Sequence, residues 1–217
     1  MDVRDMLVVH EAFRDAFDRM PDLVRGVPAG DIARAKVVAD HIELIQDFLH
    51  LHHKGEDDLL WPKLLERAPA DLHPTLQLMD DQHVRIDALI TEGAKALEAW
   101  RREAGTADGE HLADLLVDLG AALTEHLGIE EKEVLSVVGR YLTVPEWHQI
   151  GDHAINGLPK SRLPIIFGML AYFASPEVVK LLLSPAPLVP RLLMPLLGPR
   201  AYASHARRVY GSAAKRA

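Results

Sequence analysis

No cysteine occurs anywhere among the 217 residues. The chain can therefore form no disulfide, catalytic thiolate, zinc–thiolate site or iron–sulfur cluster. Any metal that it binds has to be held by nitrogen and oxygen donors. The sequence does contain 12 histidines, a high number for this length, and they are the first reason to look for such a site.

Long apolar runs are also missing. The longest uncharged stretch covers residues 163–176 and is interrupted by Pro164 and Gly168. It is shorter than the roughly 20 apolar residues that a membrane-spanning helix needs. The N-terminus carries charged residues where a signal peptide would need a basic start and an apolar run. We therefore expect a cytoplasmic protein.

Strand-like alternation bounded by hairpin turns is absent as well. Apolar residues instead recur at steps of three and four, which is typical of amphipathic helices. A first stripe runs over residues 3–17 and is followed by breaks at Pro21 and Gly26. Asp31 is a candidate N-cap for a second helix that should end near Pro62. A third helix is expected over residues 71–100, a turn over 105–109, and a fourth helix through Val134.

Four helices with mostly short connections predict an all-α fold, an antiparallel up-down four-helix bundle. A change in composition predicts where it ends. Residues 1–140 carry 29 acidic and 15 basic side chains, whereas residues 141–217 carry 3 acidic and 9 basic ones. Proline also becomes more frequent there, and Thr143 with Glu146 forms a capping-box pattern that opens a further helix. We expect a bundle over residues 1–142 and a helical, proline-broken extension over 143–217.

The extension is apolar and finally basic. Packing on the bundle is the simplest expectation, because a large apolar surface is rarely left exposed. Residues 163–210 could instead form a membrane-surface or homodimer contact, with arginines such as Arg191 and Arg200 favouring anionic lipid. No nucleic-acid partner is expected, since the bundle is acidic and the basic residues are not interleaved with stacking aromatics.

The predicted apolar stripes contain histidines where aliphatic residues would be expected. One lies on each of the four helices: His10, His52, His83 and His126. Glu56 follows His52 by four residues, and Glu130 follows His126 by four. This spacing places both side chains of each pair on one helix face. Six nitrogen and oxygen donors exceed what one tetrahedral ion needs and suit two metal ions bridged by the carboxylates.

The order of these residues repeats along the chain. His10 and His52 are 42 residues apart, and His83 and His126 are 43 apart. Each pair ends in a glutamate four residues further on. The sequence therefore predicts two helical hairpins related by a pseudo-twofold axis, and two buried carboxylates that need a metal or another cation to balance them.

This H…HxxxE…H…HxxxE order resembles the hemerythrin-like, HHE cation-binding family over roughly residues 1–140. The resemblance implies two iron ions, Fe²⁺ or Fe³⁺, bridged by Glu56 and Glu130 and an oxo or hydroxo group. It implies that His10 and His52 serve one iron and that His83 and His126 serve the other. Manganese would be compatible with the same donors.

The resemblance has one departure. Oxygen-carrying hemerythrins have a His-x3-His pair on the third helix, whereas Met79 and Asp87 lie four residues from His83 here. A centre with four histidines would be more open, which favours peroxide chemistry, nitric oxide binding or sensing over reversible oxygen carriage.

Two stripes of the second helix could face the site. His53 and Asp57 have the same spacing as His52 and Glu56, but the stripe through His53 includes Gln46 and His50, which look solvated. We therefore choose His52 and Glu56 and expect His53 to be peripheral. Whether His53, Asp57 or Asp87 contributes to the site stays open at this point.

The function expected from these features is a non-heme di-iron protein that binds or reacts with a small species such as O₂, peroxide or nitric oxide. The alternatives are a catalase-like enzyme that disproportionates peroxide, an iron buffer, and a metal-free helical interaction module. No catalytic residue separate from the metal ligands is predicted.

Overall fold

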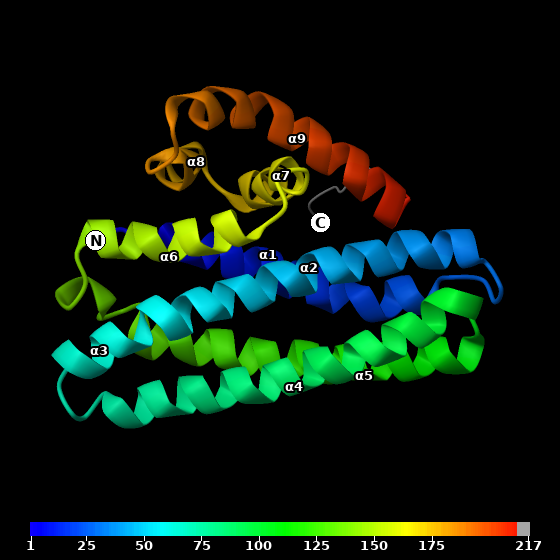
Figure 1. The fold of residues 1–217 in the computed structure, drawn as a ribbon, viewed down its shortest axis with the longest axis horizontal. Coiled ribbons are helices and arrows are strands. Elements are labelled where there is room, and N and C mark those ends of the chain that lie inside the picture. The colour runs from blue at the N-terminus through cyan, green and yellow to red at the C-terminus, as the bar shows by residue number, and fades with distance from the viewer. Residues whose placement is uncertain (212–217) are drawn as a thin grey trace.

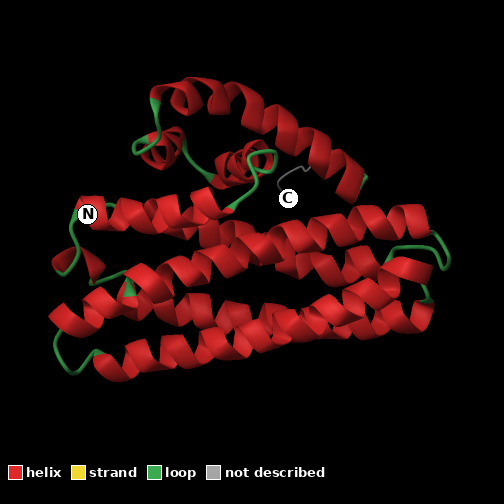
Figure 2. Ribbon diagram, viewed as in Figure 1, coloured by secondary structure: helices red, strands yellow, loops and turns green. Residues whose placement is uncertain are grey.

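The computed structural model describes residues 1–211, and within this range every regular element is a helix (Figure 2). Four long helices form an antiparallel bundle (Figure 1). Their bounds are α1 Arg4–Arg25, α2 Ile32–Leu59, α4 His73–Glu103 and α5 Thr106–Ile129. A short helix, α3 (Trp61–Arg67), joins α2 to α4, and a π-helical turn (Glu130–Val134) and a 3-10 turn (Val138–Arg140) follow α5.

Two expected boundaries were wrong, and a third was confirmed. Pro21 lies inside α1 rather than ending it, and the C-cap is Gly26. The second helix does end near Pro62: α2 stops at Leu59, and Pro62 lies in the first turn of α3, where its missing N–H is not needed. The turn between α4 and α5 is shorter than residues 105–109, since α5 already begins at Thr106 and Gly109 packs inside it against Trp100.

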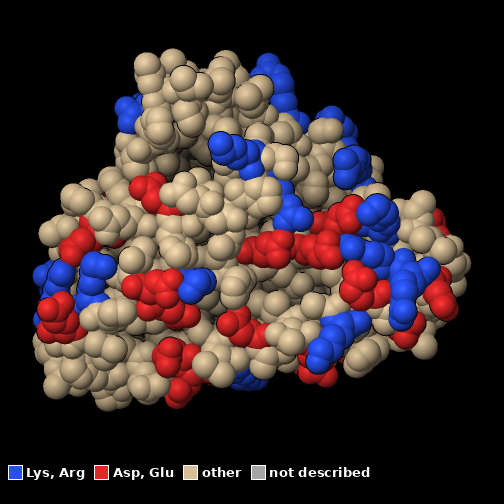
Figure 3. All heavy atoms as spheres, viewed as in Figure 1, with Lys and Arg blue, Asp and Glu red and all other residues tan. Residues whose placement is uncertain are grey.

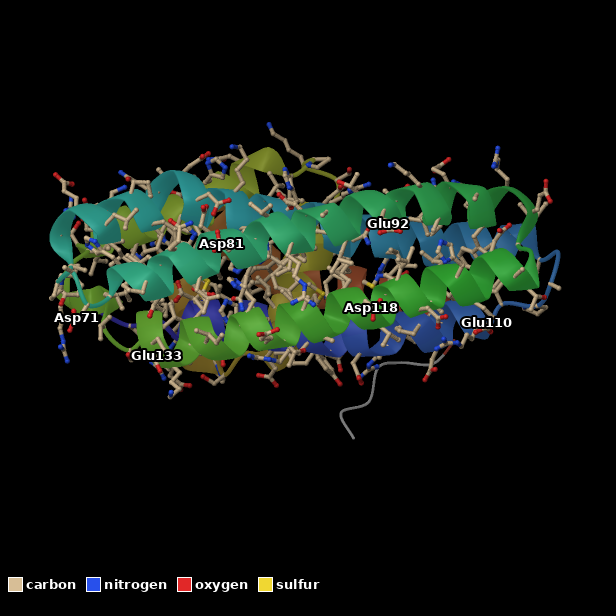
Figure 4. The ribbon with its side chains drawn as sticks, turned by 90° about the horizontal axis from the view of Figure 1, so that it is seen from below. Asp71, Asp81, Glu92, Glu110, Asp118 and Glu133 are labelled. Atoms are coloured by element: carbon tan, nitrogen blue, oxygen red, sulfur yellow. The ribbon has the colours of Figure 1, made fainter. Side chains whose placement is uncertain are left out.

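The acidic excess of the bundle lies on its outer surface. Acidic side chains of and beside α4 and α5 point away from the interior in Figure 4: Asp71, Asp81, Glu92, Glu110, Asp118 and Glu133. Figure 3 shows the same preference on another face, where red side chains gather over the bundle. Among the described residues only two carboxylates are buried, Glu56 and Glu130, and both are 0% exposed. Their burial therefore needs a separate reason.

The described part of the extension, residues 143–211, forms four more helices that lie along one side of the bundle (Figure 1). They are α6 Val144–Gly157, α7 Leu163–Phe173, α8 Pro176–Leu183 and α9 Leu188–Tyr210. The expected capping box is present, since Thr143 and Glu146 bond each other's backbone N–H at the start of α6. Apolar residues of α7 and α9, including Ile166 and Ala206, belong to the same core as α1 and α2. The extension therefore packs on the bundle.

The C-terminal end of α9 is tied to α2 by buried polar contacts. His41 Nδ1 lies 3.0 Å from His205 Nε2, and the Tyr210 hydroxyl lies 3.1 Å from His41 Nε2. Burial lowers the pKa of His41 to about 3, so the ring is neutral and can accept the tyrosine hydrogen bond. Arg34 of α2 also donates to the carbonyls of Arg208 and Val209.

The first half of α9 has an outward apolar stripe. Its side chains are between 45% and 69% exposed: Leu188, Val189, Leu192, Leu193, Leu196 and Leu197. The membrane-surface or homodimer contact expected through residues 163–210 stays a prediction. Within the described residues, no helix combines the length and apolar character needed to span a bilayer.

Helices α7 and α9 cross at two glycines. A Cβ on Gly168 would collide with the carbonyl of Gly198, and a Cβ on Gly198 would collide with the Phe167 ring. The two backbones can approach this closely only because neither residue has a side chain.

We predict that Gly168→Ala lowers the free energy of unfolding by about 1–3 kcal/mol, because the methyl group forces α7 and α9 apart. Urea denaturation of the full chain measures this effect. Gly151→Ala is the matched control: it lies in α6, and its Cβ would meet nothing within 4 Å. This control should be neutral or slightly stabilising. Equal stability of both variants would contradict the close crossing.

Candidate metal centre

A buried cluster of histidines and glutamates lies inside the bundle. Each long helix contributes: α1 provides His10, α4 provides His83, α5 provides His126, and α2 provides His52 and Glu56. Glu130 enters from the π-helical turn after α5. None of these side chains is more than 5% exposed. The structure thus brings together all six residues singled out by the sequence.

Glu56 lies between two histidines from different helices. Its Oε1 is 3.2 Å from His52 Nε2, and its Oε2 is 3.5 Å from His83 Nε2. One carboxylate oxygen therefore faces each histidine. This is the arrangement of a carboxylate that can bridge two metal ions.

Glu130 occupies the corresponding position for the other two histidines. Its Oε2 lies 3.3 Å from His10 Nε2 and 3.9 Å from His126 Nε2. The two glutamates thus each connect a histidine of the first predicted pair, His10 and His52, to a histidine of the second.

The ring nitrogens of His83 and His126 face each other at 3.1 Å, Nε2 to Nε2. The Nδ1 atoms of both rings face acceptors, Asp57 Oδ1 at 2.6 Å and Gln82 Oε1 at 3.2 Å. The ring protons therefore belong on Nδ1, and the two Nε2 lone pairs point at each other. A cation between them removes this repulsion.

His53 lies inside the cluster, although the sequence placed it at the periphery. It is 2% exposed, and its ring stacks on that of His83 at a centroid distance of 4.0 Å. His53, Glu56, His83 and His126 present donor atoms within 4.8 Å of one another, and so do His10, His52 and Glu56. The centre therefore contains five histidines rather than four, and Glu56 belongs to both groups.

The expectation for His53 was wrong because the face of α2 that carries Gln46 and His53 packs against α4 and α5. The His53 ring contacts the rings of His83 and His126, and Gln46 lies beside Gly93. Helix α6 covers another face of α2, where Gly55 lies beside the Ile150 carbonyl. The buried arc of α2 is therefore wider than the single stripe expected of a bundle helix, and Gln46 is buried as well. His50 is exposed as expected.

Three further side chains orient the histidines. Asp57 and Gln82 hold His83 and His126, and Glu131 Oε1 lies 2.9 Å from His10 Nδ1. Partners of this kind hold the ring so that Nε2 faces the metal. Asp57 is thus an orienting residue, whereas Asp87 is about half exposed and pairs with His50 outside the centre.

The π-helical turn explains how two consecutive glutamates serve one site. Glu130 approaches His10 Nε2, and Glu131 approaches His10 Nδ1. A π turn winds more residues into one turn than an α-helix and is frequent at functional sites. The sequence pattern of four-residue spacing contained no signal for this turn, so Glu131 was missed as a site residue.

Burial controls the electrostatics of the cluster. It raises the pKa of Glu56 well above its usual value, and the nearby Glu130 raises it further. It also raises the pKa of Glu130. For the histidines, burial and the neighbouring rings lower the pKa of His52 and His53, and they bring that of His126 to about 2. The protein alone therefore does not stabilise charge here.

Glu131 behaves differently. Partial burial raises its pKa, but hydrogen bonds from His10 and Arg14 outweigh this effect and bring it to about 2. Arg14 pairs with Glu131 at 2.7 Å. It is thus the outer carboxylate, and neither of the two buried ones, that has an arginine partner.

Eight donor atoms of the cluster have no hydrogen-bond partner among the described residues. They are His10 Nε2, His52 Nε2, both ring nitrogens of His53, and both oxygens of Glu56 and of Glu130. A buried polar atom without a partner costs about 1–3 kcal/mol. Imidazole nitrogens and carboxylate oxygens are good donors to iron, zinc or manganese. The residues present therefore fit a bound metal.

We predict that His53→Ala weakens metal binding by at least about tenfold, because it removes a donor rather than a peripheral ring. His50→Ala, three residues earlier on the exposed side of α2, is the matched control and should bind metal as the wild type does. Metal titration of both purified chains measures the difference. Unchanged metal affinity in His53→Ala would show that His53 is a peripheral residue and not a metal donor.

A second prediction concerns the metal-free protein. Glu56→Gln should raise its free energy of unfolding in chelator by about 1–3 kcal/mol, since it removes one of two unbalanced buried carboxyls. The same variant should lose the stabilisation that added metal gives to the wild type. Chemical denaturation with and without metal separates the two effects. A loss of stability in chelator would mean that Glu56 is paired within the protein.

Comparison with known families agrees with this geometry. The profile described as the hemerythrin HHE cation binding domain matches residues 1–138, which contain the whole cluster. Searches of curated proteins and of solved structures find no significant match. Since the profile covers more than half of the chain, this protein belongs to the hemerythrin HHE cation-binding family.

Proposed function

We propose that the chain is a non-heme di-iron protein that binds or reacts with a small oxygen or nitrogen species, such as O₂, peroxide or nitric oxide. His10 and His52 would serve one iron, and His83 and His126 the other, with Glu56 and Glu130 bridging. His53 would join the second iron as a fifth histidine. Histidine and carboxylate donors suit both ferrous and ferric iron, so iron bound here supplies one-electron chemistry.

The observation that carries this proposal is the pair of fully buried, mutually close carboxylates. Each carboxylate faces a histidine of both groups, and both lack hydrogen-bond partners. One ion would leave part of this donor set without charge compensation, whereas two ions can use both carboxylates and one nitrogen of each histidine. The donor atoms also fall into two adjacent groups that share Glu56, which fits two metal ions.

The two halves of the proposed centre are not equivalent. Three histidines surround the half at His83, whereas His10 and His52 alone serve the other. Fewer protein donors leave more positions for an external ligand. We therefore place the small ligand at the His10–His52 half.

Residues around the proposed centre would orient the histidine rings and exclude water. Asp57, Glu131 and Gln82 keep ring nitrogens facing inward, and the surrounding aliphatic core excludes water. Because Glu131 is paired with Arg14, it stays ionised and can hold the proton of His10 at Nδ1.

The first test is metal content per chain after purification without metal-affinity resins, on wild type and His126→Ala together. We expect about two irons per wild-type chain and an absorption band from ligand-to-metal charge transfer, both lost in the variant. Val117→Ala, an exposed change on the same helix, is the control. No iron in the wild type, and no uptake of ferrous iron without oxygen, would reject the proposal.

Turnover then distinguishes the enzymatic alternative from ligand binding. Sustained oxygen release from hydrogen peroxide would establish catalase-like activity. Stoichiometric, reversible binding of nitric oxide or oxygen without turnover would establish a carrier or sensor. Loading well beyond two irons would indicate iron buffering instead.

A further inference from the structure

A large apolar cavity lies between the bundle and the extension. Its volume is about 490 Å³, within the range of roughly 300–1,000 Å³ that is typical of pockets for organic ligands. Val9, Phe48 and His52 line it from the bundle. Leu170, Leu183 and Met194 are among the residues that line it from α7, α8 and α9. The extension therefore turns a bundle surface into the wall of an internal site.

His52 connects this cavity to the metal centre. Its Nε2 faces Glu56 at 3.2 Å, and its ring also lines the cavity. His52 belongs to the half of the centre that has fewer histidines. Of the six histidine and glutamate residues expected as ligands, it is the one that lines the cavity. A molecule in the cavity would therefore reach the more open half of the centre.

The interior of the cavity offers little to a polar molecule. Trp147 is a polar residue on its wall, and its indole N–H is already directed at Asp5, 3.1 Å away. Most of the remaining wall is aliphatic. An apolar occupant gains dispersion contacts with these aliphatic walls. The other polar side chains of the inner wall, such as His52 and His148, are too few to match the many polar groups of a sugar or nucleotide.

The rim of the cavity is polar and lies between α6 and the α8–α9 connection. Asp152, Asn156, Lys160 and Pro187 line it and are exposed. In the space-filling view the surface is hollowed between the extension and the bundle (Figure 3). Lys160 forms no ion pair with any residue that the structure describes. It is the only lysine or arginine on the described lining, which also contains the carboxylates of Asp5 and Asp152. An apolar interior with an ammonium group free of ion pairs at the rim fits an amphiphile whose acidic head pairs with Lys160.

We propose that this cavity binds a long-chain fatty acid, with the carboxylate at Lys160 and the acyl chain running inward toward His52. The single chain fits an enclosed apolar site better than a peptide helix, which would need its backbone ends solvated. An encounter between the metal centre and the bound acyl chain, or its oxidised forms, rests on the proposed function. The binding itself does not.

The test is calorimetric titration of the full chain with monomeric palmitic acid, in metal-stripped and iron-loaded forms. Both forms should bind one equivalent. Ala186→Phe and Ala154→Phe, which place bulk on the lining, should weaken binding by at least about tenfold. Val189→Phe adds the same bulk on the exposed face of α9, outside the lining, and should bind as the wild type does. If Ala154→Phe fails to fold, Ala186→Phe on the connection still tests the site.

The position of the ligand is tested separately. Lys160→Ala should weaken binding of palmitic acid several-fold and leave that of hexadecanol unchanged. Palmitate brominated at the chain should quench the fluorescence of Trp147, and Trp147→Phe should abolish most of that quenching. Equal affinity for acid and alcohol in the wild type would overturn the role of Lys160.

Two outcomes would overturn the site as a whole. One is no binding of palmitic acid to either form. The other is binding to phospholipid vesicles alone, which would assign the exposed leucines of α9, rather than the cavity, to lipid. Palmitate binding to a chain that takes up no iron would support the acyl site while rejecting the proposed function, so the two failures are distinguishable.

Discussion

Two carboxylates buried side by side, without a cation from the protein, set the conditions for the rest of this structure. Glu56 and Glu130 are wholly buried, and Arg14, which approaches the cluster, pairs with Glu131 instead. Such an arrangement is costly in the protein alone. The orienting contacts of the histidines, the π-helical turn and the wide buried arc of α2 all have a physical reason if positive charge is bound between these carboxylates.

The sequence predicted the bundle and the convergence of six polar residues because both depend on periodicity. A four-residue spacing places His52 with Glu56 and His126 with Glu130 on one face, whatever the details of packing. The position of His53 could not be predicted in this way, because the polar residues of its stripe, such as Gln46, suggested a solvated face, whereas this face of α2 packs against α4 and α5. Glu131 was missed because a π turn breaks the spacing on which the inference relied.

The extension affects the centre through the same helix. Packing against α4 and α5 buries His53, whereas α6 to α9 help to enclose the cavity that His52 lines. Two consecutive histidines of α2 are therefore placed by different neighbours, one beside His83 and one at the cavity wall. A bundle alone would leave that side of His52 open to solvent. The extension thus forms much of the wall of the cavity beside His52.

Anomalous diffraction at the iron absorption edge, from crystals grown with ferrous iron and without oxygen, tests the central claim most directly. The account predicts two iron peaks per chain. One peak should lie beside His10 and His52 and the other beside His53, His83 and His126, with Glu56 and Glu130 contacting both. A single peak with one glutamate uncoordinated, or no peak within the bundle, would contradict it.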